Sequence, residues 1–476
     1  MSDNVKGSIE PSLGWVQIVR LGMVQAALGA IVVLATSTLN RVMVVELGLA
    51  AMLPGFLVGL HYAVQVSRPV MGLRVDLWGR STPLVNAGMA ILAISSIAAA
   101  ASVQVMAWST LVGMIVSAVA FFGIGVGVSA SGTALLALLA RTVSSARRAA
   151  AATITWVMMI IGIIISAATA ATMLDPYSHQ QLLIVTASIC WPAVLIAVVS
   201  VAGIERKAVA VPETPEPEVE GASLFQVLGD IWSETTVRRF AIFVFISMLA
   251  YSAQDLILEP YAGLVFGLSV GESTSLAATQ HQGVLLGMLI VGVIGSLPLL
   301  RRHVPMVAWT LLGCVLSAAG LAALATAMYW AAASDLPKLV FFLGLGNGIF
   351  AVGAIGSMFS FARRGIAKRE GTRVGIWGAA QAIAFALGGI LATSGVDLIM
   401  LLGGGVSVAY GSIFVIEALL FLAAAKLALG ILAGPVPAPS KAKSVGDVFT
   451  QGIAAMEGMS DGHTSATPRR HEGGIV

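Results

Sequence analysis

Twelve apolar stretches, each about as long as a membrane-crossing helix, make up most of this chain. A span needs roughly 20 apolar residues, and in lipid it must satisfy its own backbone hydrogen bonds. Only 10% of the residues are charged, far fewer than in an average soluble domain. We therefore predict an all-α membrane protein with twelve transmembrane helices. The expected spans are 17–40, 51–72, 83–104, 108–140, 149–173, 181–204, 238–266, 274–300, 305–331, 337–362, 372–396 and 406–432.

The two halves of the chain repeat each other at a spacing of about 220 residues. Repeats of this length in an apolar chain are typical of membrane carriers built from two bundles of helices. We therefore predict two pseudo-symmetric six-helix bundles, in which His61 and His281 face each other across the pseudo-twofold axis. The repeated pairs include His61 and His281, Gly72 and Gly292, Trp108 and Trp330, Gly123 and Gly344, Gly125 and Gly346, and Gly127 and Gly348.

Lys and Arg residues follow the even-numbered spans and are nearly absent from the opposite connections. Cytoplasmic loops of membrane proteins carry such an excess, so both termini are expected in the cytoplasm. The net charge of +3 therefore reflects membrane topology and indicates no nucleic-acid partner. Cys190 and Cys314 fall inside spans without partners at redox or zinc spacing, which favours a role as small apolar fillers.

Shifts in composition divide the chain into two bundles, a linker and two tails. The linker holds an acidic, Pro-rich stretch that cannot fold on its own, followed by an amphipathic stripe at 224–232. A second stripe lies at 445–456, and either stripe docks a partner or rests on lipid headgroups. The predicted parts are a cytoplasmic tail at 1–16, a bundle at 17–204, a cytoplasmic linker at 205–237, a bundle at 238–433 and a cytoplasmic tail, disordered at its end, at 434–476.

A short motif separates the second span from the third. Gly72, Asp76, Gly79 and Arg80 have the spacing G-x-x-x-D-x-x-G-R, which resembles the signature loop of the major facilitator superfamily. Gly72 allows close helix approach, Asp76 can sit at a helix end, and Arg80 can anchor at the headgroups. The resemblance implies the major facilitator fold and a gating loop here. The second half lacks the acid and the Gly-Arg pair, so we expect an asymmetric gate.

Few polar side chains interrupt the spans. An ionisable group at membrane depth costs several kcal/mol unless it is paired or hydrated, so such residues are candidates for function. We expect them to converge on a shared cavity at the seam between the bundles. The candidates for binding a pigment or another substrate are Arg41, Glu46, His61, Gln65, Arg68, Asp255, Glu259, His281, Gln282 and Glu417.

Each candidate also has a simpler explanation. Arg41 and Glu46 could form an ion pair at the rim of the first span. Asp255 and Glu259 would repel one another if both were ionised, so one either takes part in proton coupling or meets an arginine. Each histidine is either a hydrogen-bonded packing residue or a ligand for the magnesium of a chlorin. Glu417 could contact only backbone or water.

Two longer runs resemble the PucC family, also called the bacteriochlorophyll delivery family, over about residues 15–430. The first is Leu39-Asn40-Arg41-Val42-Met43-Val44-Val45-Glu46-Leu47 with His61-Tyr62, Gln65 and Arg68-Pro69, and the second is Gln254-Asp255-Leu256-Ile257-Leu258-Glu259-Pro260-Tyr261. The resemblance implies a protein that delivers bacteriochlorophyll to light-harvesting complexes, or assists their assembly, in the photosynthetic inner membrane. The implied partners are membrane lipid, antenna polypeptides or bacteriochlorophyll synthase, with bacteriochlorophyll as a transient ligand and no permanently bound cofactor.

An enzymatic role is not expected. A prenyl-transferring synthase must hold a diphosphate through magnesium, which calls for two Asp-rich clusters near the cytoplasmic face. Only Asp255 and Glu259 approximate such a cluster, and they belong to the opposite side of the membrane in the predicted topology. The sequence therefore leaves two functions open: a pigment carrier or assembly factor, and a proton-coupled transporter of a small solute that uses Asp255, Glu259 and Glu417.

Overall fold

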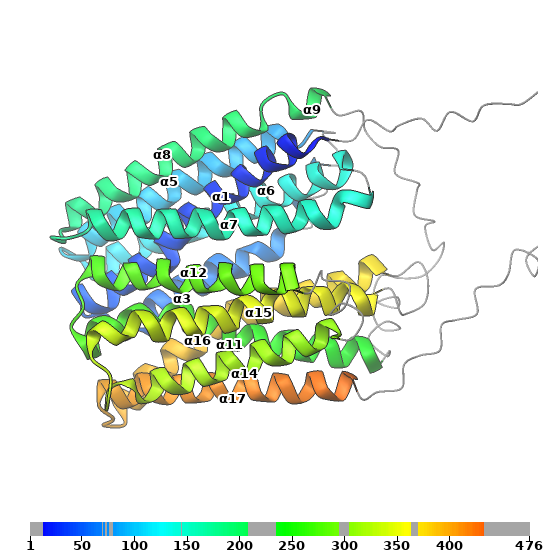
Figure 1. The fold of residues 1–476 in the computed structure, drawn as a ribbon. Helices are drawn as coiled ribbons and strands as arrows, with labels where there is room; N and C mark the ends of the chain where they lie inside the picture. The colour runs from blue at the N-terminus through cyan, green and yellow to red at the C-terminus, as the bar shows by residue number, and fades with distance from the viewer. Residues whose placement is uncertain are drawn as a thin grey trace, which may run out of the picture.

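The computed structural model of this chain describes residues 13–68, 70–71, 74–75, 80–143, 145–207, 235–294, 304–362 and 370–432. Within these ranges the chain is helical and contains no strand (Figure 1). The all-α prediction is therefore confirmed. The two predicted amphipathic stripes, at 224–232 and 445–456, lie outside the described residues.

Two groups of helices follow one another along the chain. The first group contains α1 (Trp15–Val33), η1 (Leu34–Thr38), α2 (Leu39–Arg41), η2 (Val42–Glu46), α3 (Met52–Val64), η3 (Gln65–Ser67), α5 (Thr82–Met106), α6 (Thr110–Thr142), α7 (Ser145–Met173), α8 (His179–Val201) and α9 (Ile204–Lys207). The second contains α11 (Thr235–Phe266), α12 (Val270–Ile294), α14 (Met306–Ala327), η4 (Ala333–Asp335), α15 (Leu336–Ala362), α16 (Glu370–Leu401) and α17 (Val406–Leu432).

Eleven helices of the described part are long and apolar enough to cross a membrane, and Met52–Ser67 is a shorter apolar helix. These twelve helices correspond to the twelve predicted spans. The first one runs from Trp15 to Glu46, so the predicted end at residue 40 was wrong. Its last part includes two π-helical segments, η1 and η2. The helix continues past residue 40 because the charge of Arg41 is paired with Glu46 inside the fold.

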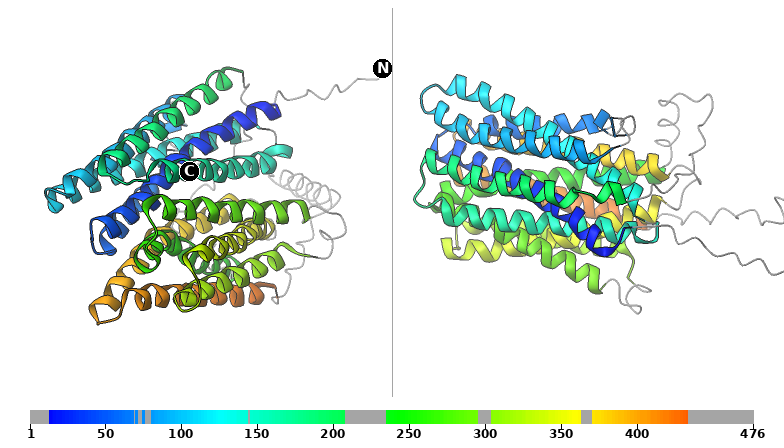
Figure 2. Two further views of the ribbon diagram at one scale, coloured as in Figure 1. Left: turned by 60° about the vertical axis from the view of Figure 1, so that its left-hand side comes forward. Right: turned by 90° about the horizontal axis from the view of Figure 1, so that it is seen from above.

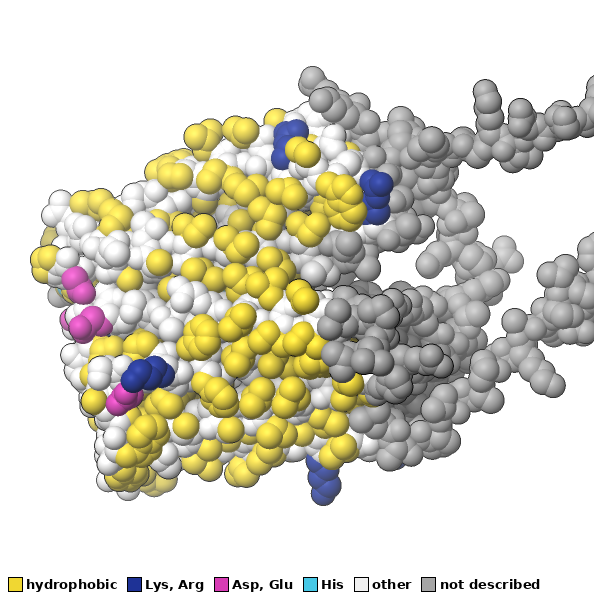
Figure 3. Space-filling view, in the orientation of Figure 1, with side chains coloured by type: hydrophobic (Ala, Val, Ile, Leu, Met, Phe, Trp, Pro, Cys, Tyr) yellow, Lys and Arg dark blue, Asp and Glu magenta, His cyan; other side chains and the backbone are white. Residues whose placement is uncertain are grey.

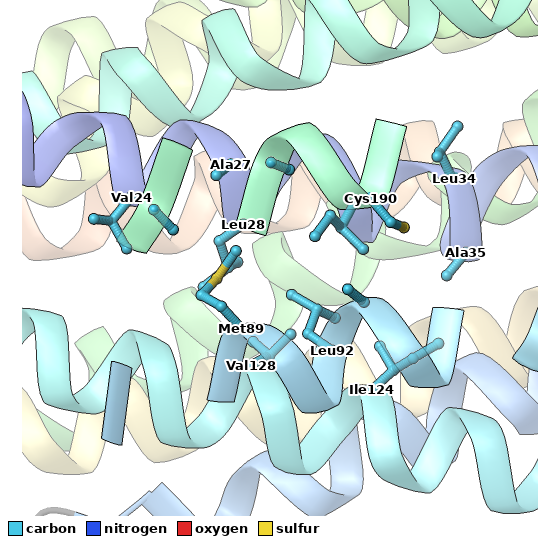
Figure 4. Close-up of a cluster of buried hydrophobic side chains, with 14 of the residues drawn as sticks. Val24, Ala27, Leu28, Leu34, Ala35, Met89, Leu92, Ile124, Val128 and Cys190 are labelled. Atoms are coloured by element: carbon cyan, nitrogen blue, oxygen red, sulfur yellow. The ribbon is translucent and has the colours of Figure 1, made fainter. Parts of the chain in front are cut away.

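Each group of helices has its own hydrophobic core. One cluster of buried residues extends from Leu13 to Ile204 with two additions from the second half, and the other extends from Val237 to Ala428. Figure 4 shows part of the first core, where Leu28 of α1, Met89 of α5 and Cys190 of α8 lie close together. Two separate cores confirm the prediction of two bundles, and the left view of Figure 2 shows the bundles as two sets of helices.

In both bundles a glycine of the fourth span allows close contact with the third span. A Cβ on Gly127 of α6 would lie 2.7 Å from the backbone nitrogen of Leu92 in α5 and 2.8 Å from the carbonyl oxygen of Gly88. A Cβ on Gly346 of α15 would lie 2.6 Å from the backbone nitrogen of Ser317 in α14. Only glycine allows these pairs of backbones to approach so closely. Each half thus has a close contact between its third and fourth span, made by glycines that are not partners in the repeat.

The two ends of the molecule differ. We call one the Asp175 end, which holds the connections at 47–51, 174–178, 267–269 and 402–405, and the other the Glu205 end, where α1 begins and α17 ends. Figure 3 shows hydrophobic side chains over the middle of one face and charged side chains nearer the two ends. The bundles meet along two seams, α3 against α16 and α7 against α12.

Candidate functional site at the seam between the bundles

Three polar side chains of the second span form a hydrogen-bonded chain. The Arg68 guanidinium donates to Oε1 of Gln65, and Nε2 of Gln65 lies 3.1 Å from Nε2 of His61. His61 is only 1% exposed, and its Nδ1 is buried without a hydrogen-bond partner among the described residues. The predicted stripe of His61, Gln65 and Arg68 is therefore present on one face of α3 and η3.

His281 occupies a different environment in α12. Its Nδ1 lies 2.8 Å from the carbonyl oxygen of Ala277, one turn earlier, and the residue is half-buried. No hydrogen bond or ring contact joins His281 to His61 in the described part of the chain. His61 lies on the helix that packs against α16, and His281 lies on the helix that packs against α7. The two histidines thus belong to equivalent seams.

Aromatic side chains bridge the α3/α16 seam. The ring of Phe385 in α16 lies 5.2 Å from that of Tyr62 in α3 and 6.1 Å from that of Tyr251 in α11, measured between centroids. The carboxyl of Asp255 lies within electrostatic range of both phenols. This group was missed from the sequence, where single aromatic residues on three different helices give no local pattern.

The two acids of α11 do not act as a pair. Nε2 of Gln280 lies 3.5 Å from Oδ1 of half-buried Asp255. Glu259 is 1% exposed and accepts a hydrogen bond from the Ser37 hydroxyl, with the Thr274 hydroxyl 3.4 Å from its other oxygen. Ser37 belongs to the first bundle, so Glu259 joins the two bundles.

Arg41 also joins the bundles. It is 2% exposed and forms an ion pair with Glu46, which confirms the simpler explanation for these two residues. Its second terminal nitrogen donates to the carbonyl oxygen of Leu268 in the second half, at 2.9 Å. The neighbouring Asn40 donates to the carbonyl oxygen of Leu256 in α11, at 2.6 Å. The end of the first helix is therefore bonded to α11 and to the connection after it.

Two further candidates differ in their surroundings. Glu417 is 1% exposed, and neither of its oxygens has a hydrogen-bond partner among the described residues. Gln282 is exposed and lies on the outward stripe of α12 with Leu286 and Leu289. Gln282 therefore does not belong to the buried polar group of the seam, because α12 directs that stripe away from the core.

Two aspartates that were not among the predicted candidates each cap the start of a helix in the opposite bundle. Oδ1 and Oδ2 of Asp397 in α16 accept from the backbone nitrogens of Ala51 and Met52 at the start of α3, at 3.0 and 2.7 Å. Asp175 after α7 accepts from the Ser269 hydroxyl at 2.7 Å and from the Gly271 nitrogen at 3.3 Å, at the start of α12. The spacing of 175 and 397 is that of the repeat, which was the signal that could have revealed them.

Most of the predicted gating loop cannot be placed. Gly72, Asp76 and Gly79 lie outside the described residues, and Arg80 is exposed. Beside it, Glu205 of α9 accepts from the backbone nitrogens of Ser81 at 2.6 Å and Thr82 at 3.1 Å, at the start of α5. Partial burial acts to raise the pKa of Glu205, but hydrogen bonds from Ser81 and Thr82 together with the charge of Arg80 outweigh it and lower the pKa. This contact joins the last helix of the first bundle to the start of its third span.

No group of three or more His, Cys, Asp or Glu side chains that could hold a metal ion occurs among the residues that the structure describes. The seam between the bundles instead holds separate histidines, amides, phenols and carboxyls. These groups can donate or accept hydrogen bonds, and a neutral imidazole can also provide one axial ligand to a metal.

Solved structures of transporters share this fold. A bacterial homologue of the human lysosomal transporter Spinster, in an inward-facing and unoccupied conformation, matches with a TM-score of 0.64 and 13% identity, covering 88% of this chain and 97% of that one. A D-xylose-proton symporter matches with a TM-score of 0.62 and 15% identity, covering 85% and 96%. The chain therefore has the major facilitator fold.

Sequence comparisons define the family. The Bacteriochlorophyll synthase 44.5 kDa chain of Rhodobacter capsulatus is 46% identical over 430 residues, covering 89% of this chain and 96% of that protein. Protein PucC of Cereibacter sphaeroides is 28% identical over 430 residues, covering 84% and 89%. The model of the PUCC protein family matches residues 38–435. This chain, a multi-pass membrane protein, therefore belongs to the PUCC protein family.

Proposed function

We propose that this protein holds bacteriochlorophyll within the membrane and delivers it to light-harvesting complexes, or assists their assembly. The family match and the relatives named for PucC and for bacteriochlorophyll synthase support this proposal. The observation that carries it is the composition of the α3/α16 seam. Polar His61 and Asp255 there adjoin the aromatic group of Tyr62, Tyr251 and Phe385.

Such a seam suits a flat, largely apolar ring with polar substituents. Aromatic faces pack against a macrocycle, and a few placed donors and acceptors orient it. The apolar outer surface of the bundles leaves the long tail of the pigment in lipid. The isolated polar groups favour transient holding, because they form no cluster that could fix a metal or a diphosphate. We accordingly propose a non-enzymatic role, also for this relative of a protein named as a synthase chain.

The proposed setting is the photosynthetic inner membrane, with both termini and the Glu205 end in the cytoplasm. The bias of Lys and Arg toward one set of connections supports this orientation. Antenna polypeptides or bacteriochlorophyll synthase are the proposed partners.

The test is the absorption spectrum of cells that lack the gene. We expect the antenna bands to fall while free bacteriochlorophyll is still made, and a plasmid copy to restore them. A Phe385→Ala copy should restore them only in part, since it removes the ring that joins Tyr62 to Tyr251. Normal antenna bands in the deletion strain would contradict the proposal, and loss of all pigment would indicate a role in synthesis.

A second candidate is a proton-coupled transporter of a small solute. The observation that favours it is Glu417, a buried acid without a hydrogen-bond partner among the described residues and within electrostatic range of Asp255. Membrane acids of this kind often carry protons in transporters. This function predicts solute uptake into vesicles that follows an imposed pH gradient and fails in Glu417→Gln. It also predicts that a deletion strain keeps its normal antenna absorption.

A further inference from the structure

His281 and His61 are equivalent positions of the repeat, but their hydrogen bonds fix the lone pair of the neutral imidazole differently. Among the described residues, it is free on Nε2 of His281 and occupied on Nε2 of His61. A backbone carbonyl only accepts hydrogen bonds, so Nδ1 of His281, 2.8 Å from the oxygen of Ala277, carries the proton. In a neutral ring the lone pair then lies on Nε2. That nitrogen makes no hydrogen bond within the described part of the chain, and the residue is half-buried, whereas His61 is fully buried.

The opposite assignment follows for His61. The guanidinium of Arg68 only donates, so it fixes Oε1 of Gln65 as the acceptor and turns the Gln65 amide nitrogen toward His61. Nε2 of His61 therefore accepts, and its lone pair is occupied. The remaining nitrogen, Nδ1, carries a proton and is buried without a hydrogen-bond partner among the described residues. His61 can offer a donor, whereas its lone pair is already used.

We infer that His281, through Nε2, is the axial ligand that takes the magnesium of bacteriochlorophyll, and that His61 is not. The inference rests on the proposed function and places the magnesium contact at the α7/α12 seam, the counterpart of the α3/α16 seam, through Nε2 of His281. Histidines that bind metals nearly always donate their other ring N–H to a carbonyl or carboxylate, which fixes the tautomer and raises the basicity of the ligating nitrogen. Ala277 supplies this carbonyl to His281.

The surroundings of His281 fit a flat apolar ring. One turn further along the same stripe, Leu285 packs on a cluster that includes Ile160 of α7 and Val284. One turn in the other direction, α7 and α12 meet through small residues, Ala167, Ala277 and Ala278. On the other side, the outward stripe of α12 begins with Gln282. A pigment bound here would therefore lie at the α7/α12 seam, with apolar side chains of both bundles beside it.

The test compares bacteriochlorophyll with bacteriopheophytin, which has the same ring without magnesium. The full chain in lipid nanodiscs is titrated with each pigment, and binding is followed by quenching of pigment fluorescence. We expect the parent protein to bind the magnesium pigment roughly tenfold more tightly. His281→Ala should remove this preference, and added imidazole should restore it by filling the space of the lost ring.

His61→Ala is the matched control. The ring of His61 lies at the other seam and its lone pair is bonded to Gln65, so this change should keep the preference for magnesium. A preference that persists in His281→Ala, or that disappears in His61→Ala, would overturn the inference. Equal binding of the two pigments by the parent protein would also overturn it and leave the carrier function standing. Binding of neither pigment would overturn the proposed function itself.

Discussion

The starts of α3 and α12 are equivalent in the two halves, but they are held in different ways. Both receive a carboxylate from the opposite bundle, Asp397 at α3 and Asp175 at α12. The start of α12 has in addition its own capping box, in which Ser269 and Glu272 bond each other's backbone nitrogens. The start of α3 has no cap from its own segment. The start of α12 is thus capped by residues of its own segment, whereas, within the described residues, the start of α3 is capped only by the opposite bundle.

The same contrast appears in the first helix of each half. The first helix ends in two π segments and places the ion pair of Arg41 and Glu46 at the Asp175 end. In α11, the position about 220 residues later is Tyr261, whose hydroxyl donates to the carbonyl oxygen of Leu324 within its own bundle at 2.9 Å. The two bundles therefore have corresponding helices, but they differ at this position. Arg41 of the first bundle is hydrogen-bonded to the second bundle, whereas Tyr261 of the second is hydrogen-bonded within its own.

Of the changes that test this difference between the bundles, the loss of the ion pair of Arg41 and Glu46 should reduce stability most. Glu46→Gln leaves the charge of Arg41 buried without a counter-ion, so we expect a loss of about 2 kcal/mol in the free energy of unfolding. Glu46 is itself about one-third exposed, which keeps the loss below that of a fully buried pair. Thermal unfolding in detergent measures it.

The control is Asp335→Asn at the same end, where the carboxylate pairs with exposed Lys338 three residues later. This change should leave the unfolding temperature unaltered. Equal stability of Glu46→Gln and Asp335→Asn would show that the pair of Arg41 and Glu46 contributes no more than a surface contact.

The next largest loss of stability distinguishes the cap by Asp397 from the cap by Asp175. Asp397→Ala should cost about 1 kcal/mol, because it leaves two backbone N–H groups at the start of α3 without an acceptor. Asp175→Ala should cost less, since Ser269 and Glu272 still cap α12. Unfolding temperatures of the two variants, measured side by side, test the order. A larger loss in Asp175→Ala would refute the asymmetry.

The smallest effect is at the Glu205 end. Glu205 caps α5 in the first bundle, whereas α14, its counterpart, begins after Pro305 without a side-chain cap. Because the fold lowers the pKa of Glu205, its contribution is present above the unfolded-state pKa and is lost as the pH falls through the folded-state pKa. We expect about 0.5 kcal/mol, because the carboxylate is half-exposed.

Glu205→Gln should therefore flatten the acid side of the stability-pH curve, and the parent and variant curves should meet at low pH. The measurement is thermal unfolding across a pH series. Curves that stay parallel through the acid range would exclude a role for the titration of Glu205.

The fold followed from the sequence because its signals are long and redundant. Apolar stretches and the repeat place twelve helices, and glycines such as Gly127 and Gly346 mark where backbones meet. The ion pair of Arg41 and Glu46 was also predictable, since the two charges are near in sequence. The end of the first helix at Glu46 was not predicted, because a helix continues through a buried Arg41 only where the arginine is paired.

The site was less predictable, since its contacts join residues far apart in the chain. Phe385 carries no pattern until α16 is packed between α3 and α11. Gln282 was placed among the candidates because it follows His281, but one step along a helix turns a side chain about a quarter of the way round the axis. Which ring nitrogen of His61 and of His281 carries the proton depends on hydrogen bonds to residues one turn away. The sequence does not show which of these hydrogen bonds form.

The reciprocal aspartates have a consequence for how such a molecule could arise. Each half provides an acid and a helix start, and each acid accepts hydrogen bonds from the helix start of the other half. A chain of half this length would therefore have met a second copy of itself through two identical contacts, the arrangement of an isologous dimer. Joining the copies allowed the two contacts to diverge, and the capping box at α12, which the start of α3 lacks, is one such divergence.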